Sequence, residues 1–141
     1  MTQLVRDVMT TGVETLPPHA SLVEAAQLMR DRHIGDVFVA QGDQVLGVLT
    51  DRDITVRAVA EGPDPHTVPV RSVCTPDVVT VGPDDEVSDA VLKMRRHAVR
   101  RLPVVEKGHM KGVVSLGDLA VARDPDSALA DVSEASPNNG M

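Results

Sequence analysis

Two short motifs that pair a hydroxyl with a carboxylate offer the chemistry that stands out in this sequence. Thr50 is followed three residues later by Asp53, and Ser115 is followed three residues later by Asp118. Each motif follows a run typical of a strand and opens a run typical of a helix. A hydroxyl at such a junction can cap the helix or meet an anion, because free N–H groups and the helix dipole favour negative charge there. The Asp can accept hydrogen bonds from a vicinal diol.

The same spacing also suits an ordinary helix cap. A Ser or Thr with an acidic residue three positions later forms a capping box, in which both side chains accept hydrogen bonds from backbone N–H groups. Capping alone does not require the same Asp in both motifs, so the repetition favours a binding role. Capping and ligand binding both stay open at this point.

Catalytic motifs do not accompany these residues. Ser115 lies in Val-Val-Ser-Leu-Gly, which lacks the first glycine of a nucleophile elbow. The five histidines show no zinc-ligand spacing. The acidic pairs Asp51/Asp53 and Asp84/Asp85 come at expected helix starts, where acids are electrostatically favoured. We therefore expect no enzymatic activity, no metal and no obligatory cofactor.

The two motifs occupy equivalent positions of an internal repeat. Shifted by 65 positions, residues 5–54 align with residues 70–119 without a gap, and 14 of the 50 pairs are identical. Such a match predicts two copies of one structural unit. We expect the first repeat at 1–60, a linker at 61–66 and the second repeat at 67–123. An acidic tail at 124–141 should be frayed, with at most a short helix near Ser127–Ala135.

Both copies show the same order of expected elements, β-α-β-β-α, which predicts an α/β (α+β) fold. One copy cannot bury its sheet face and both helices by itself, so the two copies should pack about a pseudo-twofold axis. Ser21 has capping-box spacing at the start of the first helix. The expected strands are Val13–Leu16, Val37–Ala40 and Val45–Thr50, then Val78–Val81, Leu102–Glu106 and Met110–Ser115; the closing helices lie near Asp51–Ala60 and Leu116–Arg123.

Composition excludes several classes of function. The net charge is -7, Trp and Tyr are absent, and Phe38 is the single aromatic residue. Single-strand nucleic-acid binders need aromatic stacking platforms, and binders of the phosphate backbone need basic surfaces. Cys74 is the only cysteine, which excludes an intrachain disulfide. No apolar run approaches the roughly 20 residues of a membrane span, and no signal peptide is evident. We expect a cytoplasmic protein without nucleic-acid or membrane partners.

Several further motifs show that the repeat resembles the CBS domain family. Each copy closes with Gly-x-x-Thr/Ser-x-x-Asp, as Gly47 to Asp53 and as Gly112 to Asp118. The Met-Thr of the family's opening helix is present at Met9-Thr10 and altered at Cys74-Thr75, and Val-Arg-Arg-Leu-Pro-Val-Val is intact at 99–105. The resemblance covers residues 4–122. Two copies in tandem resemble a CBS pair, or Bateman module, and are similar to small stand-alone bacterial CBS-pair proteins of the actinobacterial hypoxic-response type.

This resemblance implies a regulatory, ligand-sensing function. CBS pairs bind adenosine-containing ligands such as AMP, ADP, ATP or S-adenosylmethionine in clefts between the two repeats, and they signal to a protein target, which the sequence does not name. They form homodimers as a flat four-repeat disc. In the family, the closing Asp holds the ribose hydroxyls and the Thr or Ser reaches the phosphate. Carried over, these roles fall on Asp53 and Asp118, and on Thr50 and Ser115.

The adenine of such a ligand would need to lie between aliphatic side chains, because the chain has no Trp or Tyr and a single Phe. Backbone amides and apolar side chains near the motifs are the candidates, and plain core packing is the alternative for each side chain. The candidate side chains are Val13, Ile34 and Val37 in the first copy, and Val78, Val99 and Leu102 in the second.

The two copies differ in charge where the central strands begin. Asp36 and Phe38 stand in the first copy where the second has Arg101 and Pro103. Arginine suits phosphate through its planar fork, so Arg100 and Arg101 predict a phosphorylated ligand in the second copy, and the first copy should be empty or take a less anionic one. The alternative role of the arginines is to complement a helix C-terminus. The alternative function is a structural or protein-interaction dimer whose pockets stay empty.

Overall fold

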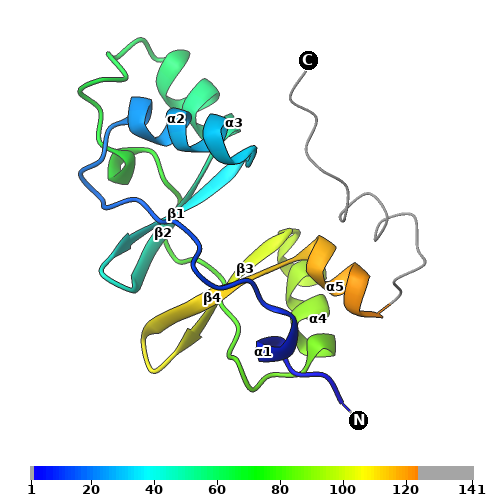
Figure 1. Ribbon diagram of the computed structural model, residues 1–141. Coiled ribbons are helices and arrows are strands. Elements are labelled where there is room, and N and C mark those ends of the chain that lie inside the picture. Colours follow the sequence, from blue (N-terminus) through cyan, green and yellow to red (C-terminus); the bar gives the residue numbers. More distant parts are fainter. Residues whose placement is uncertain (1, 124–141) are drawn as a thin grey trace. The chain divides into compact units, whose positions relative to one another are not determined.

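The structure, a computed structural model, describes residues 2–123 of the chain (Figure 1). The chain divides into two compact units. One unit runs from Glu14 to Val78, and the other joins the N-terminal segment up to Val13 to the chain from Val79 onward. The predicted acidic tail, with its short helix near Ser127–Ala135, lies outside the described residues.

The unit 14–78 is built around one antiparallel hairpin. Strand β1 (Asp36–Gln41) pairs with β2 (Gln44–Thr50), and Phe38 faces Val48 in the register. Helix α2 (Leu22–Arg32) precedes the hairpin, and the short helix α3 (Asp51–Asp53) follows it. Ser21 caps α2, because its hydroxyl accepts a hydrogen bond from the Glu24 N–H at 3.1 Å, as its spacing predicted. The core of this unit combines buried residues of α2 and both strands, among them Leu22, Ala25, Val37, Val39 and Leu49.

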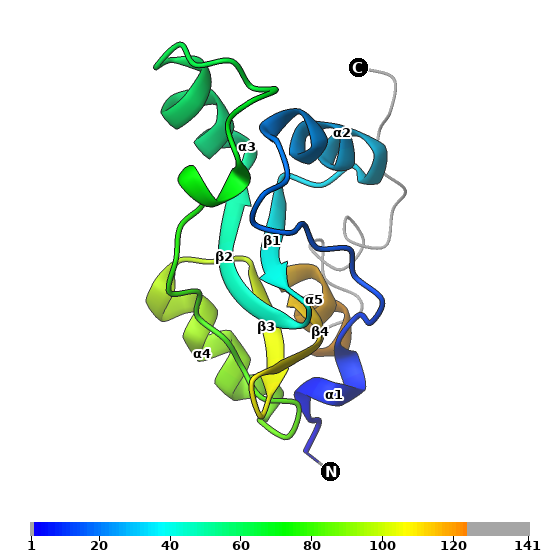
Figure 2. The same cartoon turned by 90° about the vertical axis from the view of Figure 1, so that its left-hand side faces the viewer.

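The other unit repeats this plan around a second hairpin. Strand β3 (Arg101–Glu106) pairs with β4 (His109–Ser115), after α4 (Val87–His97) and before α5 (Leu116–Arg123). The short helix α1 (Val5–Val8) of the N-terminal segment contacts α5 (Figure 2). The core of this unit includes Val5, Ala90, Leu102, Val114 and Leu119.

The central strands of both copies lie within one or two residues of their predicted bounds. Pro103 is tolerated inside β3 because it faces Val113, whose own N–H and carbonyl bond to Thr10 on the other side of β4. A proline at such a position removes no hydrogen bond from the β3–β4 ladder. In the second hairpin, Lys107 and Gly108 have φ values of 52° and 81°. Positive φ at both central residues is the requirement of a tight type I′ turn.

The predicted first strand of each copy was too long. The structure reduces Val13–Leu16 to a single parallel bridge between Leu16 and Val39, and Val78–Val81 to one between Val81 and Val104. The bridge residues Leu16 and Val81 are the last residues of the predicted strands, so residues 13–15 and 78–80 have no strand pairing.

The predicted helix Asp51–Ala60 is not a continuous α-helix. After α3 the chain forms a π-helix, η1 (Ile54–Val59), in which the Ala60 N–H bonds to the Thr55 carbonyl at 3.0 Å. Ile54, Thr55 and Val56 are all β-branched, which lowers α-helix propensity. The second copy contains no such β-branched run, and its helix α5 has the predicted bounds Leu116–Arg123.

Each hairpin is extended by a residue that belongs to the other sequence repeat. Thr10 bridges to Val113 of β4, with N···O distances of 2.8 and 2.9 Å. Thr75 bridges to Val48 of β2, with distances of 2.8 and 2.9 Å. Just before Thr75, the 3-10 helix η2 (Val70–Ser72) contributes Val70 to the core of the unit 14–78. The compact units and the sequence repeats therefore divide the chain at different residues.

Because each compact unit includes a segment of the other sequence repeat, fragments cut at different residues should differ in stability. We expect the fragment 14–78 to unfold cooperatively on heating, because it contains its whole core. A fragment of residues 1–60 should unfold without a sharp transition, since it lacks the buried Val70 and Val73 of that core. Circular dichroism at 222 nm is the measurement. An equally sharp transition for the fragment 1–60 would contradict the assignment of these residues to the core.

Candidate ligand site

Each closing motif folds into a reciprocal cap at the junction of strand and helix. The Thr50 N–H donates to Asp53 Oδ2 at 2.9 Å, and the Asp53 N–H donates to Thr50 Oγ1 at 3.0 Å. In the second copy, the Ser115 N–H donates to Asp118 Oδ2 and the Asp118 N–H donates to Ser115 Oγ, both at 3.0 Å. The capping interpretation of these motifs is therefore confirmed in both copies. Binding remains compatible with capping, because the caps use only the Oδ2 atom of each carboxylate.

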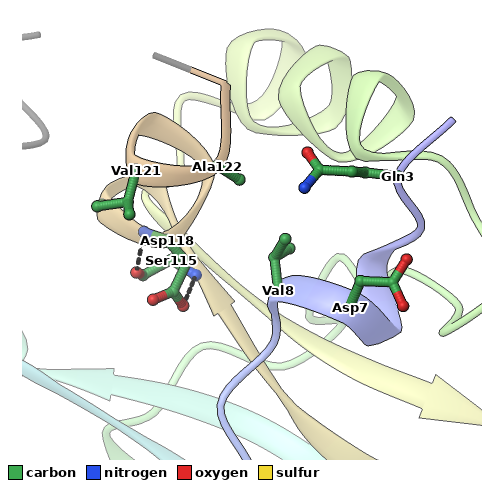
Figure 3. Close-up of a pocket in the computed structure, with 8 residues that line it drawn as sticks. Gln3, Asp7, Val8, Ser115, Asp118, Val121 and Ala122 are labelled. Atoms are coloured by element: carbon green, nitrogen blue, oxygen red, sulfur yellow. Dashed lines mark hydrogen bonds between the residues drawn. The ribbon is translucent and has the colours of Figure 1, made fainter. Parts of the chain in front are cut away.

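A cavity of about 470 Å³ lies next to the motif of the second copy (Figure 3). Its volume falls in the range of small-molecule sites, about 300–1,000 Å³. Figure 3 shows Gln3 and Val8 of the N-terminal segment on one side of it and Ala122 of α5 on the other. Its lining residues are Gln3, Asp7 and Val8 from the N-terminal segment, and Ser115, Gly117, Asp118, Val121 and Ala122.

The cavity brings together only two of the residues that the sequence singled out, Ser115 and Asp118. Gln3, Asp7 and Val8 were not predicted. Asp7 and Val8 lie in the aligned repeat, but only the docking of the N-terminal segment on β4, through Thr10 and Val113, brings them to this motif. The internal repeat does not predict that this segment joins the hairpin of the other repeat, because the corresponding segments of the two repeats are so similar.

The hairpin registers place the predicted charged residues beside the motifs. Arg101 lies directly across the hairpin from Ser115, and Asp36 lies directly across from Thr50. Arg100 is exposed, and its carbonyl accepts a hydrogen bond from the Leu116 N–H at 2.7 Å. Neither arginine lines the cavity described above. The copies therefore carry opposite charge beside the motif, and the phosphate role of the arginines stays a prediction.

The aliphatic side chains predicted to contact the adenine lie mainly in or against the two cores. Val37 and Leu102 are fully buried members of the core clusters, and Ile34 and Val99 are partly buried against the same clusters. Val13 and Val78 are partly buried. None of the six lines the cavity. Core packing accounts for Val37 and Leu102, and contact with an adenine stays a prediction for all six.

The motif of the first copy has a cation in front of it. Arg57 Nε lies 3.7 Å from Asp53 Oδ1, and Arg57 Nη1 donates to the Val73 carbonyl at 3.2 Å. Burial raises the pKa of the nearby Cys74 thiol, and the charge of Asp53 raises it further, so Cys74 is neutral at pH 7. A neutral thiol is a poor nucleophile and a poor metal ligand.

Within residues 2–123, no three His, Cys, Asp or Glu side chains lie close enough to hold a metal ion. No helix in this range is both long and apolar enough to cross a membrane.

Comparison with known proteins decides the family. The model of the CBS domain matches residues 5–59 and 70–124. The chain belongs to the CBS domain family. The CBS domain-containing protein YhcV of Bacillus subtilis is 40% identical over 133 residues, which cover 92% of this chain and 94% of YhcV. The predicted tandem pair of CBS domains with an α+β fold is thereby confirmed.

Two solved structures share this CBS fold. Hypoxic response protein 1 of Mycobacterium tuberculosis is 34% identical over 116 residues, 82% of this chain and 81% of that protein. A crystal structure of hypoxic response protein I with two coordinated zinc ions superposes with a TM-score of 0.78 at 33% identity, covering 84% of this chain and 97% of that one. The CBS pair of protein MJ0100, in complex with 5′-methylthioadenosine and S-adenosyl-L-methionine, gives a TM-score of 0.77 at 22% identity over 90% of this chain and all of that one; this likeness shows the fold alone.

Proposed function

We propose that this CBS pair is a regulatory module that binds an adenosine-containing ligand and transmits binding to a partner protein. The cavity beside Ser115 and Asp118 is the observation that carries the proposal, because it combines the family's closing motif with a volume suited to a small molecule. The candidate ligands are AMP, ADP, ATP and S-adenosylmethionine, the last of which is present in the MJ0100 complex.

The chemistry of the site suits a ribose. The Asp118 carboxylate uses Oδ2 for the cap, and its second oxygen can accept hydrogen bonds from a vicinal diol. The cap orients the carboxylate before a ligand arrives, so little side-chain freedom is lost on binding. None of these contacts breaks or makes a covalent bond. They support a binding function rather than a catalytic one, in a chain whose relatives YhcV and hypoxic response protein 1 match it over most of their length.

Ligand binding can be tested by thermal unfolding and calorimetry. We expect at least one of the four candidate ligands to raise the melting temperature of the chain, since a ligand at 100 times its Kd stabilises the folded state by about 2.7 kcal/mol. Asp118→Asn should lower affinity by roughly 10- to 100-fold, because a hydrogen bond to a charged group contributes about 1.5–3 kcal/mol. Asn can still accept from the Ser115 N–H, so the helix cap survives.

Asp53→Asn is the matched control, since it makes the same change in a motif whose carboxylate faces Arg57. We expect a smaller loss of affinity for this variant. The absence of any thermal shift with all four ligands would overturn the proposal. That result would favour the alternative, a structural or interaction protein with empty pockets.

We also propose that the chain forms a homodimer, as CBS pairs do. Val56 and Val59 on η1 are 46% and 63% exposed, and an apolar contact with a second copy would remove them from water. Val59→Asp should therefore shift the chain toward monomer in sedimentation velocity. Glu61→Gln, at an exposed polar position nearby, should leave the dimer unchanged. A monomeric wild-type chain at micromolar concentration would contradict the dimer.

A further inference from the structure

The two copies of the closing motif differ in what lies in front of the Asp carboxylate. In the first copy, the Arg57 guanidinium reaches both Asp53 Oδ1 and the backbone carbonyl of Val73, at 3.7 and 3.2 Å. It therefore lies between the closing motif and the segment that precedes Thr75. The Asp53 carboxylate and the Val73 carbonyl oxygen together bind the positively charged guanidinium of Arg57.

The equivalent residues in the second copy surround the cavity. The two CBS matches, 5–59 and 70–124, keep the shift of 65 positions, which takes Asp53 to Asp118, Arg57 to Ala122 and, in the opposite direction, Val73 to Val8. Asp118, Ala122 and Val8 all line the cavity, and Figure 3 shows them on its opposite sides. By this alignment, the cavity corresponds to the place where the first copy holds its guanidinium. Ala122 provides only a methyl group, so this place is left open.

The walls of the cavity are acidic. Asp7 adds a second carboxylate, and the residue that corresponds to it in the segment before Thr75 is the uncharged Ser72. The eight lining residues include no Lys, Arg or His. Arg101, which lies across the hairpin from Ser115, is not among them. A phosphate placed here would meet two carboxylates without a lining cation, whereas a positively charged group would meet the same kind of acceptors that Arg57 meets.

We propose that the second-copy cavity binds a ligand through a positively charged group, in the place that Arg57 fills in the first copy. The inference rests on the proposed function and makes it more specific: the ligand is an adenosine compound that carries an organic cation, such as a sulfonium or an ammonium group, rather than a phosphate. In the first copy, the Arg57 guanidinium itself takes the place of the ligand's positively charged group. Each chain therefore binds one ligand.

The charge of the ligand can be varied while its adenosine is kept. S-adenosylmethionine and S-adenosylhomocysteine differ by one methyl group and by the positive charge on sulfur, and AMP carries a negative phosphate on the same nucleoside. In isothermal titration calorimetry with the full chain, we expect S-adenosylmethionine to bind with a stoichiometry of one per chain. It should bind about tenfold more tightly than S-adenosylhomocysteine, and AMP should bind most weakly.

A reciprocal pair of substitutions tests the place of the ligand. Ala122→Arg introduces the guanidinium of the first copy and should abolish binding of S-adenosylmethionine, whereas Ala122→Ser, which keeps the side chain small, should retain it. Arg57→Ala removes the guanidinium from the first copy and should raise the stoichiometry from one to two. Circular dichroism checks that each variant is folded, and Arg57→Ala keeps the test decisive if Ala122→Arg fails to fold.

The outcomes separate this inference from the proposed function. Tighter binding of AMP than of S-adenosylmethionine, with a loss in Asp118→Asn, would overturn the preference for a cation and leave an adenosine-binding module. An unchanged stoichiometry in Arg57→Ala would overturn the role of Arg57. If none of the three compounds binds to the wild-type chain, this inference falls. If ADP and ATP also fail to bind, the proposed function falls with it.

Discussion

Gly112→Ala should destabilise the chain by about 1–3 kcal/mol or more, the usual range for forcing extra volume into a close-packed site. A Cβ atom at this position would lie 2.6 Å from the backbone oxygen of Thr10, and 3.2 Å from Met9 Sδ. Since the nearest atom belongs to the backbone, no side-chain rotation can relieve the contact. The substitution should therefore push the N-terminal segment away from β4.

The effect should extend to the ligand site. Gln3, Asp7 and Val8 reach the cavity only because their segment is held on β4, so a shift of that segment moves one wall of the site. Urea unfolding followed by circular dichroism measures the stability, and calorimetry with S-adenosylmethionine measures the binding. Intrinsic fluorescence is unsuitable because the chain has no Trp or Tyr.

Gly82→Ala is the matched control for this substitution. Its added Cβ would meet its nearest neighbour, Asp85 Oδ2, at 3.4 Å, an ordinary van der Waals contact. Its effect on the free energy of unfolding should lie within about 0.5 kcal/mol, as for substitutions that create no clash. Equal stability of the Gly112→Ala and Gly82→Ala variants would contradict the close approach of Thr10 to β4.

The repeated elements could be predicted from the sequence because their signals are local. The central strands are dense in valine, the turn Lys107-Gly108 has residues suited to positive φ, and Ser21 with Glu24 has capping spacing. Each signal depends on residues within a few positions of one another. The hairpins and the helix starts followed from these signals to within one or two residues.

The origin of the cavity walls could not be predicted, because it depends on long-range docking. The two segments that precede Thr10 and Thr75 are so similar that sequence alone does not say which hairpin each one joins. The sequence also indicated no special role for Arg57, since one arginine in an expected helix is usually a solvated residue. Only the contact of its guanidinium with Asp53 and Val73 distinguishes it.

Phe38, the single aromatic residue, also has a role in the structure that the sequence did not indicate. In the sequence, Phe38 is notable because it replaces a proline and because the chain has no other Phe and no Trp or Tyr. In the structure its side chain is 2% exposed and is the largest of the fully buried side chains among residues 2–123. Its neighbours on β1, Val37 and Val39, belong to the core cluster of the unit 14–78, and Phe38 itself does not. Since alternate residues of a strand point to opposite faces, β1 is buried on both.

Phe38→Ala should therefore lower the free energy of unfolding by about 3–5 kcal/mol, the cost of truncating a buried aromatic ring. This is a large share of the 5–15 kcal/mol that typically stabilises a domain. Thermal and urea unfolding, followed by circular dichroism, measure the loss. Phe38→Leu keeps most of the apolar volume and should cost clearly less than Phe38→Ala.

Leu92→Ala gives the reference for an exposed apolar side chain, because Leu92 is 57% exposed on α4. Its effect should lie within about 0.5 kcal/mol, as expected for a surface position. A loss of similar size for Phe38→Ala would show that the second face of β1 is open to water in solution. A loss of several kcal/mol with a small one for Leu92→Ala would show instead that the Phe38 ring is buried in solution.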